Sequence, residues 1–360
     1  MNMFKARVLA LLLTCLVVTT PQVTFAQSIE QLLQQSQTAI ESGNYSQAEA
    51  LLRQVIEINA NNIAAHNLLT IVLYSQNKFD QLITAAQKVI KLDPNPFMGY
   101  LFLGEALFKQ GKLDQAIAAY RQSIQLNPDF SLAYVSLGWV LTLQGQPDEA
   151  IEVLRQAIQL DPNNPRAYSH IGSALMLGEK LDQAIAAYRQ ALELDPNYAD
   201  VYNNLGTALM LQGKLDQAIA ALRQAVQLDP NNVNTYINLG SALSDQGKLD
   251  EAIAVYIRAF QLDSSNAVVY LNLGNLSRQK GHLEEALSFY QAILKFSPDQ
   301  PWGNSTSNHA LAHNAIGEVL QQQGKLEEAI EAFKQSIALD PNFIEAQDNL
   351  EQAQQLLEPQ

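Results

Sequence analysis

The histidines of this 360-residue chain are the residues whose spacing could bind a metal. His309 and His313 are four residues apart in "HALAH", a spacing that can place two imidazoles on one face of a helix. No neighbouring cysteine and no HExxH pattern accompanies them. His66, His170 and His282 are scattered, without a partnered serine or cysteine nucleophile. We therefore predict no catalytic residue, no metal site and no cofactor.

The glycines are spaced regularly instead of clustering in a phosphate-binding loop, and other residue types keep the same step of 34 residues. We call a set of positions separated by this period a column. The proline, glycine and tyrosine columns include Pro94, Pro128, Pro162, Pro196, Pro230; Gly104, Gly138, Gly172, Gly206, Gly240, Gly274; and Tyr100, Tyr134, Tyr168, Tyr202, Tyr236, Tyr270. A fixed period of this length indicates repeats that cannot bury their apolar faces alone and must stack.

Each repeat contains the pattern of two amphipathic helices. Tyr134, Leu137, Gly138 and Leu141 are spaced at i, i+3, i+4 and i+7, and Gly145 follows as a helix C-cap. A second apolar stripe runs through 150–158, and a proline ends it. The sequence therefore predicts helical hairpins, with the glycine column where two helices approach closely.

The run "AYVSLGWVLTLQGQPDEAIEVLRQAIQLDPNN" resembles the tetratricopeptide repeat, whose pattern is an aromatic residue, Leu-Gly, a small or aromatic residue, Ala, an aromatic residue and Pro. The resemblance covers most of the chain. It implies an all-α protein, a right-handed superhelical solenoid of about nine helix-turn-helix repeats with a C-terminal capping helix. At the N-terminal edge the repeats are degenerate, with His66 in the tyrosine column and Thr70 in the glycine column.

The period predicts the organisation of the chain as a solenoid over 27–360. Its repeats are expected at 29–62, 63–96, 97–130, 131–164, 165–198, 199–232, 233–266, 267–300 and 310–343, with an insertion at 301–309 and a capping helix at 344–360. No length remains for a catalytic domain, so we predict that the protein is not an enzyme. Trp302 in the insertion is either an exposed anchor for a partner or part of a spacer.

The first 26 residues have the features of a cleavable signal peptide. Lys5 and Arg7 precede an apolar run over 8–18, and small residues precede a predicted cleavage site after Ala26. A retained signal anchor and lipidation of Cys15 are the alternatives. Cleavage predicts export to a periplasm, a lumen or the extracellular space, with no membrane insertion of the mature chain.

The net charge of −14 argues against a nucleic-acid partner, because phosphate binding needs clustered lysine and arginine. The acidic exterior serves solubility or favours basic partners. Cys15 is the only cysteine, so the mature chain has no disulfide. Stacked apolar faces must then supply the stability.

A second stripe on the first helix of each repeat is predicted to line a concave groove, as the resemblance implies. We call it the groove stripe. Its predicted partner-binding residues, together with a neighbouring asparagine column expected to form an amide ladder, are Leu101, Phe108, Val135, Trp139, Met176, Asn203, Asn204, Met210, Asn238, Asn272 and Asn275. The alternative is that these side chains pack between repeats.

The function predicted from these features is a noncatalytic scaffold that binds a peptide or another protein in the groove. The resemblance to repeats that clamp acidic chaperone tails is incomplete, because apolar residues and Asn203 stand where lysines would be needed. The alternative function is a chaperone-like or assembly factor in an envelope or lumen, able to form a homo-oligomer.

Overall fold

The computed structural model describes residues 25–296 and 306–357. Within these ranges the chain forms nine helical hairpins followed by one further helix, and no strand. Most of the predicted signal peptide and residues 301–305 of the predicted insertion, Trp302 among them, lie outside the described residues. The prediction of an all-α solenoid of stacked helix-turn-helix repeats is confirmed.

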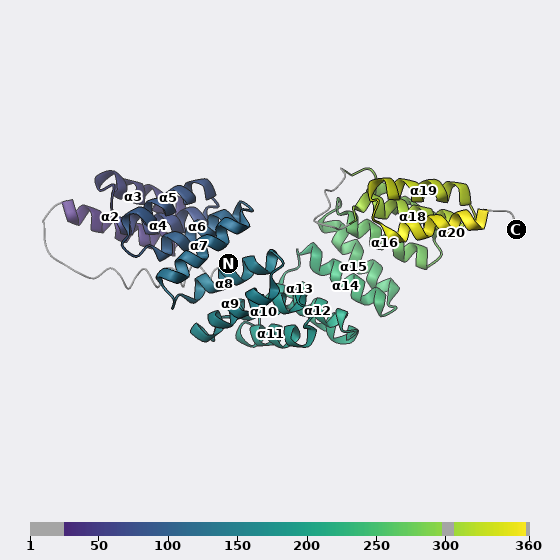
Figure 1. Cartoon of the computed structure of the whole chain (residues 1–360), viewed down its shortest axis with the longest axis horizontal. Coiled ribbons are helices and arrows are strands. Elements are labelled where there is room, and N and C mark those ends of the chain that lie inside the picture. The colour runs from purple at the N-terminus through teal and green to yellow at the C-terminus, as the bar shows by residue number, and fades with distance from the viewer. Residues whose placement is uncertain (1–24, 297–305, 358–360) are drawn as a thin grey trace. The chain divides into compact units, whose positions relative to one another are not determined.

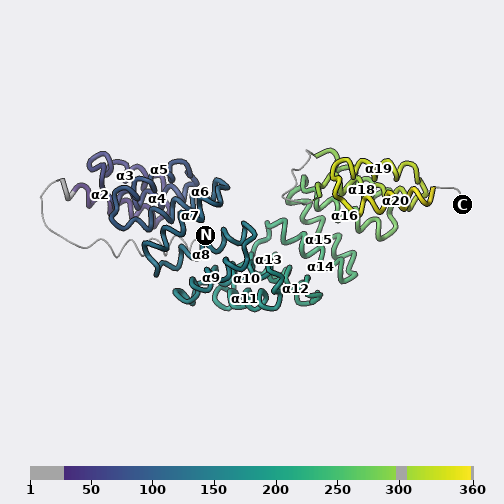
Figure 2. Tube along the Cα trace, in the orientation of Figure 1, coloured from purple at the N-terminus to yellow at the C-terminus, as the bar shows by residue number. Residues whose placement is uncertain are grey.

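The chain divides into two parts, Met1–Leu194 and Asp195–Gln360. Figure 1 shows the succession of hairpins in each part, and Figure 2 traces the same path along the backbone. The helices of the first part are α2 (Phe25–Glu41), α3 (Tyr45–Ile58), α4 (Ile63–Ser75), α5 (Phe79–Leu92), α6 (Phe97–Lys109), α7 (Leu113–Leu126), α8 (Ser131–Leu143), α9 (Pro147–Leu160), α10 (Pro165–Leu177) and α11 (Leu181–Leu194). Those of the second part are α12 (Ala199–Leu211), α13 (Leu215–Leu228), α14 (Val233–Asp245), α15 (Leu249–Leu262), α16 (Ala267–Gln279), α17 (Leu283–Ile293), α18 (Asn308–Gln322), α19 (Leu326–Leu339) and α20 (Ile344–Leu357).

A tight turn joins the two helices of each hairpin. At the end of α8, Gly145 has a φ of 79°, a left-handed conformation that suits glycine because it has no Cβ. The backbone N–H of Gln146 donates to the carbonyl of Leu141 at 2.9 Å, which satisfies one of the last carbonyls of the helix. The same bond recurs at the other hairpins, so each turn closes the end of its first helix in the same way.

The glycine column lies where the two helices of a hairpin meet. A Cβ on Gly172 would lie 2.6 Å from Cε1 of Tyr188, whose side chain is fully buried. A Cβ on Gly138 would lie 2.4 Å from Cγ of Leu154, which is also fully buried. The glycine therefore lets the second helix seat one large apolar side chain against the backbone of the first.

The last helix, α20, packs against α19, as Figure 1 shows at the C-terminal end of the chain. Ala346 and Ala353 are fully buried on its inner face. Ile344 is 68% exposed, and Leu356 is 57% exposed. No helix of the described residues is long and apolar enough to cross a membrane.

Candidate functional site

The groove stripe of the first part follows the first helices α6, α8 and α10. Leu101 is fully buried, and Val135 is 4% exposed, so both side chains belong to the core. Phe108, Trp139 and Met176 are half-buried and keep part of their surface open. The structure therefore places the exposed portion of the predicted stripe near the C-terminal halves of these helices.

Trp139 packs against the next repeat. Its indole stacks on the imidazole of His170, with ring centroids 4.6 Å apart and an interplanar angle of 24°. Burial and, to a lesser extent, the nearby Arg166 guanidinium together lower the pKa of His170 to about 3. The imidazole is therefore uncharged at neutral pH, and this stack is a contact between repeats.

Two exposed leucines continue the stripe beyond the residues predicted from the sequence. Leu143 follows Trp139 by four residues and is 49% exposed, while Leu177 occupies the same column one repeat later and is 50% exposed. Residues four apart lie on one face of a helix, so both leucines extend the stripe by one turn. The signal was present in the sequence as an apolar column, Leu143, Leu177 and Leu211, at a position where other repeats have Asp245 or Gln279.

In the second part, the stripe is more polar. Met210, Asn203 and Asn204 are half-buried on α12, and Leu211 beside them is 63% exposed. Asn275 is exposed on α16, where its side-chain oxygen accepts a hydrogen bond of 2.7 Å from the hydroxyl of Tyr290.

The predicted asparagine ladder has a different register. The amide of Asn238 donates to the side-chain oxygen of Asn203 at 2.9 Å, not to Asn204. Asn349 repeats this geometry by donating to Asn314 at 3.0 Å. No such bond is described for Asn272, because the residue at the matching position of the preceding repeat is an isoleucine. This bond between asparagine side chains links a repeat to the preceding one. It uses an amide N–H of Asn238 that was predicted to bind the backbone of a peptide.

A buried carboxyl group lies on the groove stripe of α6. Glu105 is 6% exposed, and its Oε1 accepts hydrogen bonds from Tyr120 at 3.0 Å and from Ser136 at 2.7 Å. Burial raises the pKa of Glu105, while these hydrogen bonds and the positive charge of Lys109 lower it in part. The net effect is a raised pKa, so the folded state favours the protonated carboxyl.

We expect Glu105→Gln to stabilise the protein at neutral pH, because an amide can keep the polar contacts and stays neutral without taking up a proton. Between the ordinary glutamate pKa and the raised folded value, the folded state holds a proton that the unfolded state releases. The wild-type free energy of unfolding should therefore contain a component that falls as pH rises through this window, and the variant should lack it. Urea unfolding across that pH range measures the difference.

The control for this experiment is Glu193→Gln, which removes one carboxylate at an exposed position of α11. Its free energy of unfolding should change with pH in parallel with that of the wild type. A parallel profile for Glu105→Gln as well would contradict the assignment.

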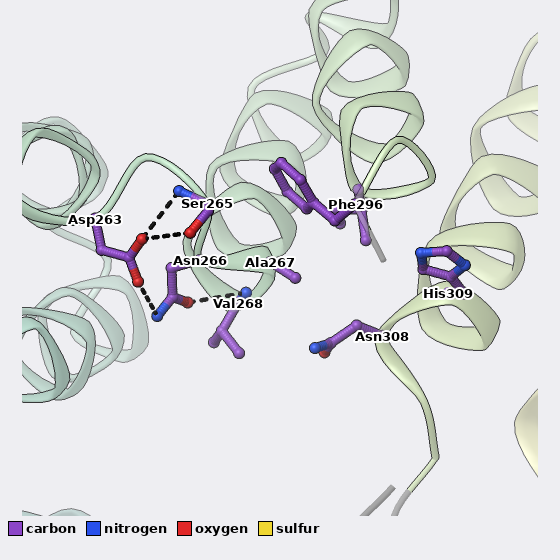
Figure 3. A pocket seen from close by; sticks show the side chains of 9 residues that line it. Asp263, Ser265, Asn266, Ala267, Val268, Phe296, Asn308 and His309 are labelled. Carbon is purple, nitrogen blue, oxygen red and sulfur yellow. Dashed lines mark hydrogen bonds between the residues drawn. The ribbon is translucent and has the colours of Figure 1, made fainter. Parts of the chain in front are cut away.

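A pocket in the second part adjoins the predicted insertion. It has a volume of about 340 Å³, and Figure 3 shows Asp263, Ser265 and Asn266 near the start of α16 on one side and Asn308 and His309 at the start of α18 on the other. The hydroxyl of Ser265, hydrogen bonded to Asp263 at 2.7 Å, lowers the pKa of that carboxyl.

The two histidines predicted to share a helix face both belong to α18, which begins at Asn308, inside the span predicted as the insertion. His313 is half-buried, and burial lowers its pKa. Within the part of the chain that the structure describes, no group of three or more histidine, cysteine, aspartate or glutamate side chains could hold a metal ion.

The stacked hairpins and their groove stripe define an α-solenoid of short repeats, and the comparisons assign its family. Family models described as "TPR repeat" match residues 172–213, 206–246 and 240–277. Models described as "Tetratricopeptide repeat" match 67–129, 101–165, 265–342 and 32–62. Together these matches cover most of the chain, which belongs to the tetratricopeptide repeat family.

Two solved structures with TM-scores above 0.5 show the same fold. A chain of the APC/C hetero-tetramer Cut9–Hcn1 is 17% identical with a TM-score of 0.59, and the match covers 92% of this chain and 76% of that one. A tetratricopeptide repeat protein from Parabacteroides merdae is 14% identical with a TM-score of 0.56, covering 72% of this chain and 98% of that one. MamA protein is 29% identical with a TM-score of 0.42, covering 48% of this chain and 93% of that one. The comparison with curated proteins found no match.

Proposed function

We propose that this chain is a noncatalytic scaffold that binds a peptide or a partner protein along the first helices of its repeats, after export and removal of residues 1–26. Family membership supports the scaffold role, because tetratricopeptide repeats generally serve in protein interaction. The observation that carries the proposed surface is the pair of half-exposed leucines, Leu143 and Leu177, in successive repeats. Apolar side chains held at this exposure at matching positions provide anchor points for an apolar partner.

The half-buried side chains beside these leucines extend the proposed surface. Met176 lies next to Leu177 in the sequence and adds a flexible thioether, which adapts to different apolar partners. Trp139 contributes the part of its indole that His170 does not cover. Leu101 and Val135 support this surface from the core and are not proposed to contact the partner.

We expect Leu143→Ser combined with Leu177→Ser to reduce recovery of a specific partner at least fivefold, because both anchors become polar and about 1 kcal/mol of apolar contact corresponds to a fivefold change. The measurement is crosslinking in the exported fraction followed by quantitative mass spectrometry of the captured proteins. Since both side chains are already half-exposed, the thermal unfolding midpoint should change little.

The matched control is Leu160→Ser, which changes a leucine that is 39% exposed at the end of the second helix α9. The control should recover the same proteins as the wild type. Identical recovery by the double variant would overturn the proposed surface. Loss of a captured second copy of this chain, with no other protein lost, would instead favour the self-associating alternative.

A further inference from the structure

A pocket in the first part lies away from the groove stripe. It has a volume of about 550 Å³ and lies between α3, α4 and α5. The part contributed by α4 is His66, Leu69 and Leu73, whereas the groove columns would continue on this helix through positions 67, 71 and 74. The pocket therefore lies on the side of α4 that faces α3 and α5, the second helices of two successive repeats.

The pocket is present where the repeat departs from its own tyrosine column. Nε2 of His66 lies 3.0 Å from the carbonyl oxygen of Ala60, six residues earlier. Tyr236 and Tyr270 donate the equivalent hydrogen bond from their hydroxyls to carbonyls six residues earlier, each at 3.2 Å. His66 thus makes the same contact to a carbonyl six residues earlier as the tyrosines of its column. Its ring is smaller than that of tyrosine and fills less of the space at this position.

The second nitrogen of this imidazole has an unused lone pair. Because a carbonyl oxygen only accepts hydrogen bonds, Nε2 of His66 carries the proton, and Nδ1 of the neutral ring is an acceptor. His66 is 6% exposed, and its Nδ1 is buried without a hydrogen-bond partner among the described residues. This unpaired nitrogen is closed to solvent, and the pocket contacts other parts of the His66 side chain.

The floor of the pocket is apolar. Leu69 is 5% exposed, Leu73 is 1% exposed and Ala85 is 7% exposed, and Ile56 closes the floor from α3. A floor of this kind favours a bulky apolar group over a hydrated ion, because its burial removes apolar surface from water.

The rim of the pocket is cationic, although the whole chain has a net charge of −14. Lys88 and Lys91 of α5 line it together with Arg53 of α3, and no acidic side chain of the described residues lines it. The equivalent positions of later repeats are mostly glutamines, namely Gln122, Gln156, Gln190 and Gln224 for Lys88 and Gln125, Gln159, Gln227 and Gln261 for Lys91. The nearby Glu49 carboxylate already pairs with Arg53 at 2.8 Å and with Lys78 at 2.6 Å. Lys88 donates a long hydrogen bond of 3.5 Å to the side-chain oxygen of Asn61, a neutral partner, so Lys88 and Lys91 both keep a positive charge that can attract an anion.

We propose that this pocket binds an acidic peptide segment of a partner protein that carries one bulky apolar side chain. The apolar side chain occupies the floor, and acidic side chains pair with Lys88 and Lys91. The chain's own residues 1–24 do not suit this site, because they include Lys5 and Arg7 and no acidic residue. The proposal is independent of the groove surface and of the partner that binds there.

Fluorescence anisotropy with labelled synthetic peptides tests the proposal. Each peptide carries one leucine, phenylalanine or tryptophan flanked by glutamates, and a matched set carries glutamines instead. We expect the glutamate peptides to bind about tenfold more tightly than their glutamine counterparts at low salt, with the difference shrinking as salt is added. Equal affinity for both sets would overturn the proposal, as would the absence of binding by either.

The repeats supply variants that should fold. Lys88→Gln with Lys91→Gln, and separately His66→Tyr, introduce residue types that the chain itself uses at the equivalent positions. We expect the lysine pair to weaken binding of the glutamate peptides about tenfold, because exposed ion pairs contribute modestly. His66→Tyr should weaken binding of both peptide sets at least as much, because the larger ring fills the pocket.

The charge-matched control is Lys214→Gln with Lys248→Gln, which removes two exposed cations from the second part. Its affinity for the peptides should equal that of the wild type, and circular dichroism should show unchanged helix content for every variant. Unchanged affinity in His66→Tyr would overturn the proposal. So would a dimer of this chain that His66→Tyr dissociates, because the occupant would then be a second copy.

Discussion

Replacing Tyr188 with alanine is expected to lower the free energy of unfolding of the first part by about 4 kcal/mol, because it removes a fully buried aromatic ring and leaves a cavity. The ring lies directly against the backbone of Gly172, where neighbouring atoms cannot move in to fill the space. Urea unfolding followed by circular dichroism measures the loss. In a stack where each repeat contacts only its neighbours, the transition should also broaden or split.

Two milder substitutions separate the contributions of the ring and of its hydroxyl. Tyr188→Leu should cost less than about 1.5 kcal/mol, because the chain already places Leu154 and Leu222 at this position. Tyr188→Phe should cost about 1 kcal/mol, since it removes the hydrogen bond between the hydroxyls of Tyr188 and Ser173, which lie 3.1 Å apart. An alanine variant no less stable than the leucine variant would contradict the cavity argument.

Replacing Gly172 with leucine is expected to lower the free energy of unfolding by about 3 kcal/mol, because the new side chain has to displace a buried ring. Its Cβ alone would lie 2.6 Å from the ring of Tyr188, closer than van der Waals contact allows. Gly172→Ala should cost less, since alanine gains about 1 kcal/mol over glycine in a helix. The same urea experiment measures both variants.

The control is Gly178→Ala, at the C-terminal end of the same helix. There a Cβ would meet its nearest neighbour, the carbonyl oxygen of Ala174, at 3.5 Å, so the free energy of unfolding should stay within about 0.5 kcal/mol of the wild type. Adding Tyr188→Leu should not rescue Gly172→Leu, because a Cβ on Gly138 would meet Leu154 at 2.4 Å in the repeat that already has leucine. Full rescue would show that the tyrosine ring alone creates the need for glycine.

The fold was predictable because one short period repeats through the chain. The glycine column marks where the two helices of a hairpin meet, and at Gly172 it faces the large side chain of Tyr188 on the second helix. The start of α18 at Asn308 was missed, because an inserted segment removes the period that the prediction used.

The groove was harder to predict, because each first helix is partly covered by the next one. Leu101 and Trp139 both lie on the helix face that was predicted to be open. In the structure Leu101 is buried, and Trp139 stacks on His170. That difference depends on the distance between neighbouring helices, which a pattern within one repeat does not encode. The asparagine register differs for the same reason, since Asn238 bonds to Asn203 of the preceding repeat.

One hairpin lacks the residue that its turn favours. Seven turns of the described chain have glycine in the left-handed conformation, and Asn77 takes this conformation in another, but at the turn between α10 and α11 Glu179 has a φ of 59°. A glutamate in this region of backbone space costs about 1 kcal/mol relative to glycine. Amide protons around Glu179 should consequently exchange with solvent faster than those around Gly145, because the turn between α10 and α11 should unfold locally more often.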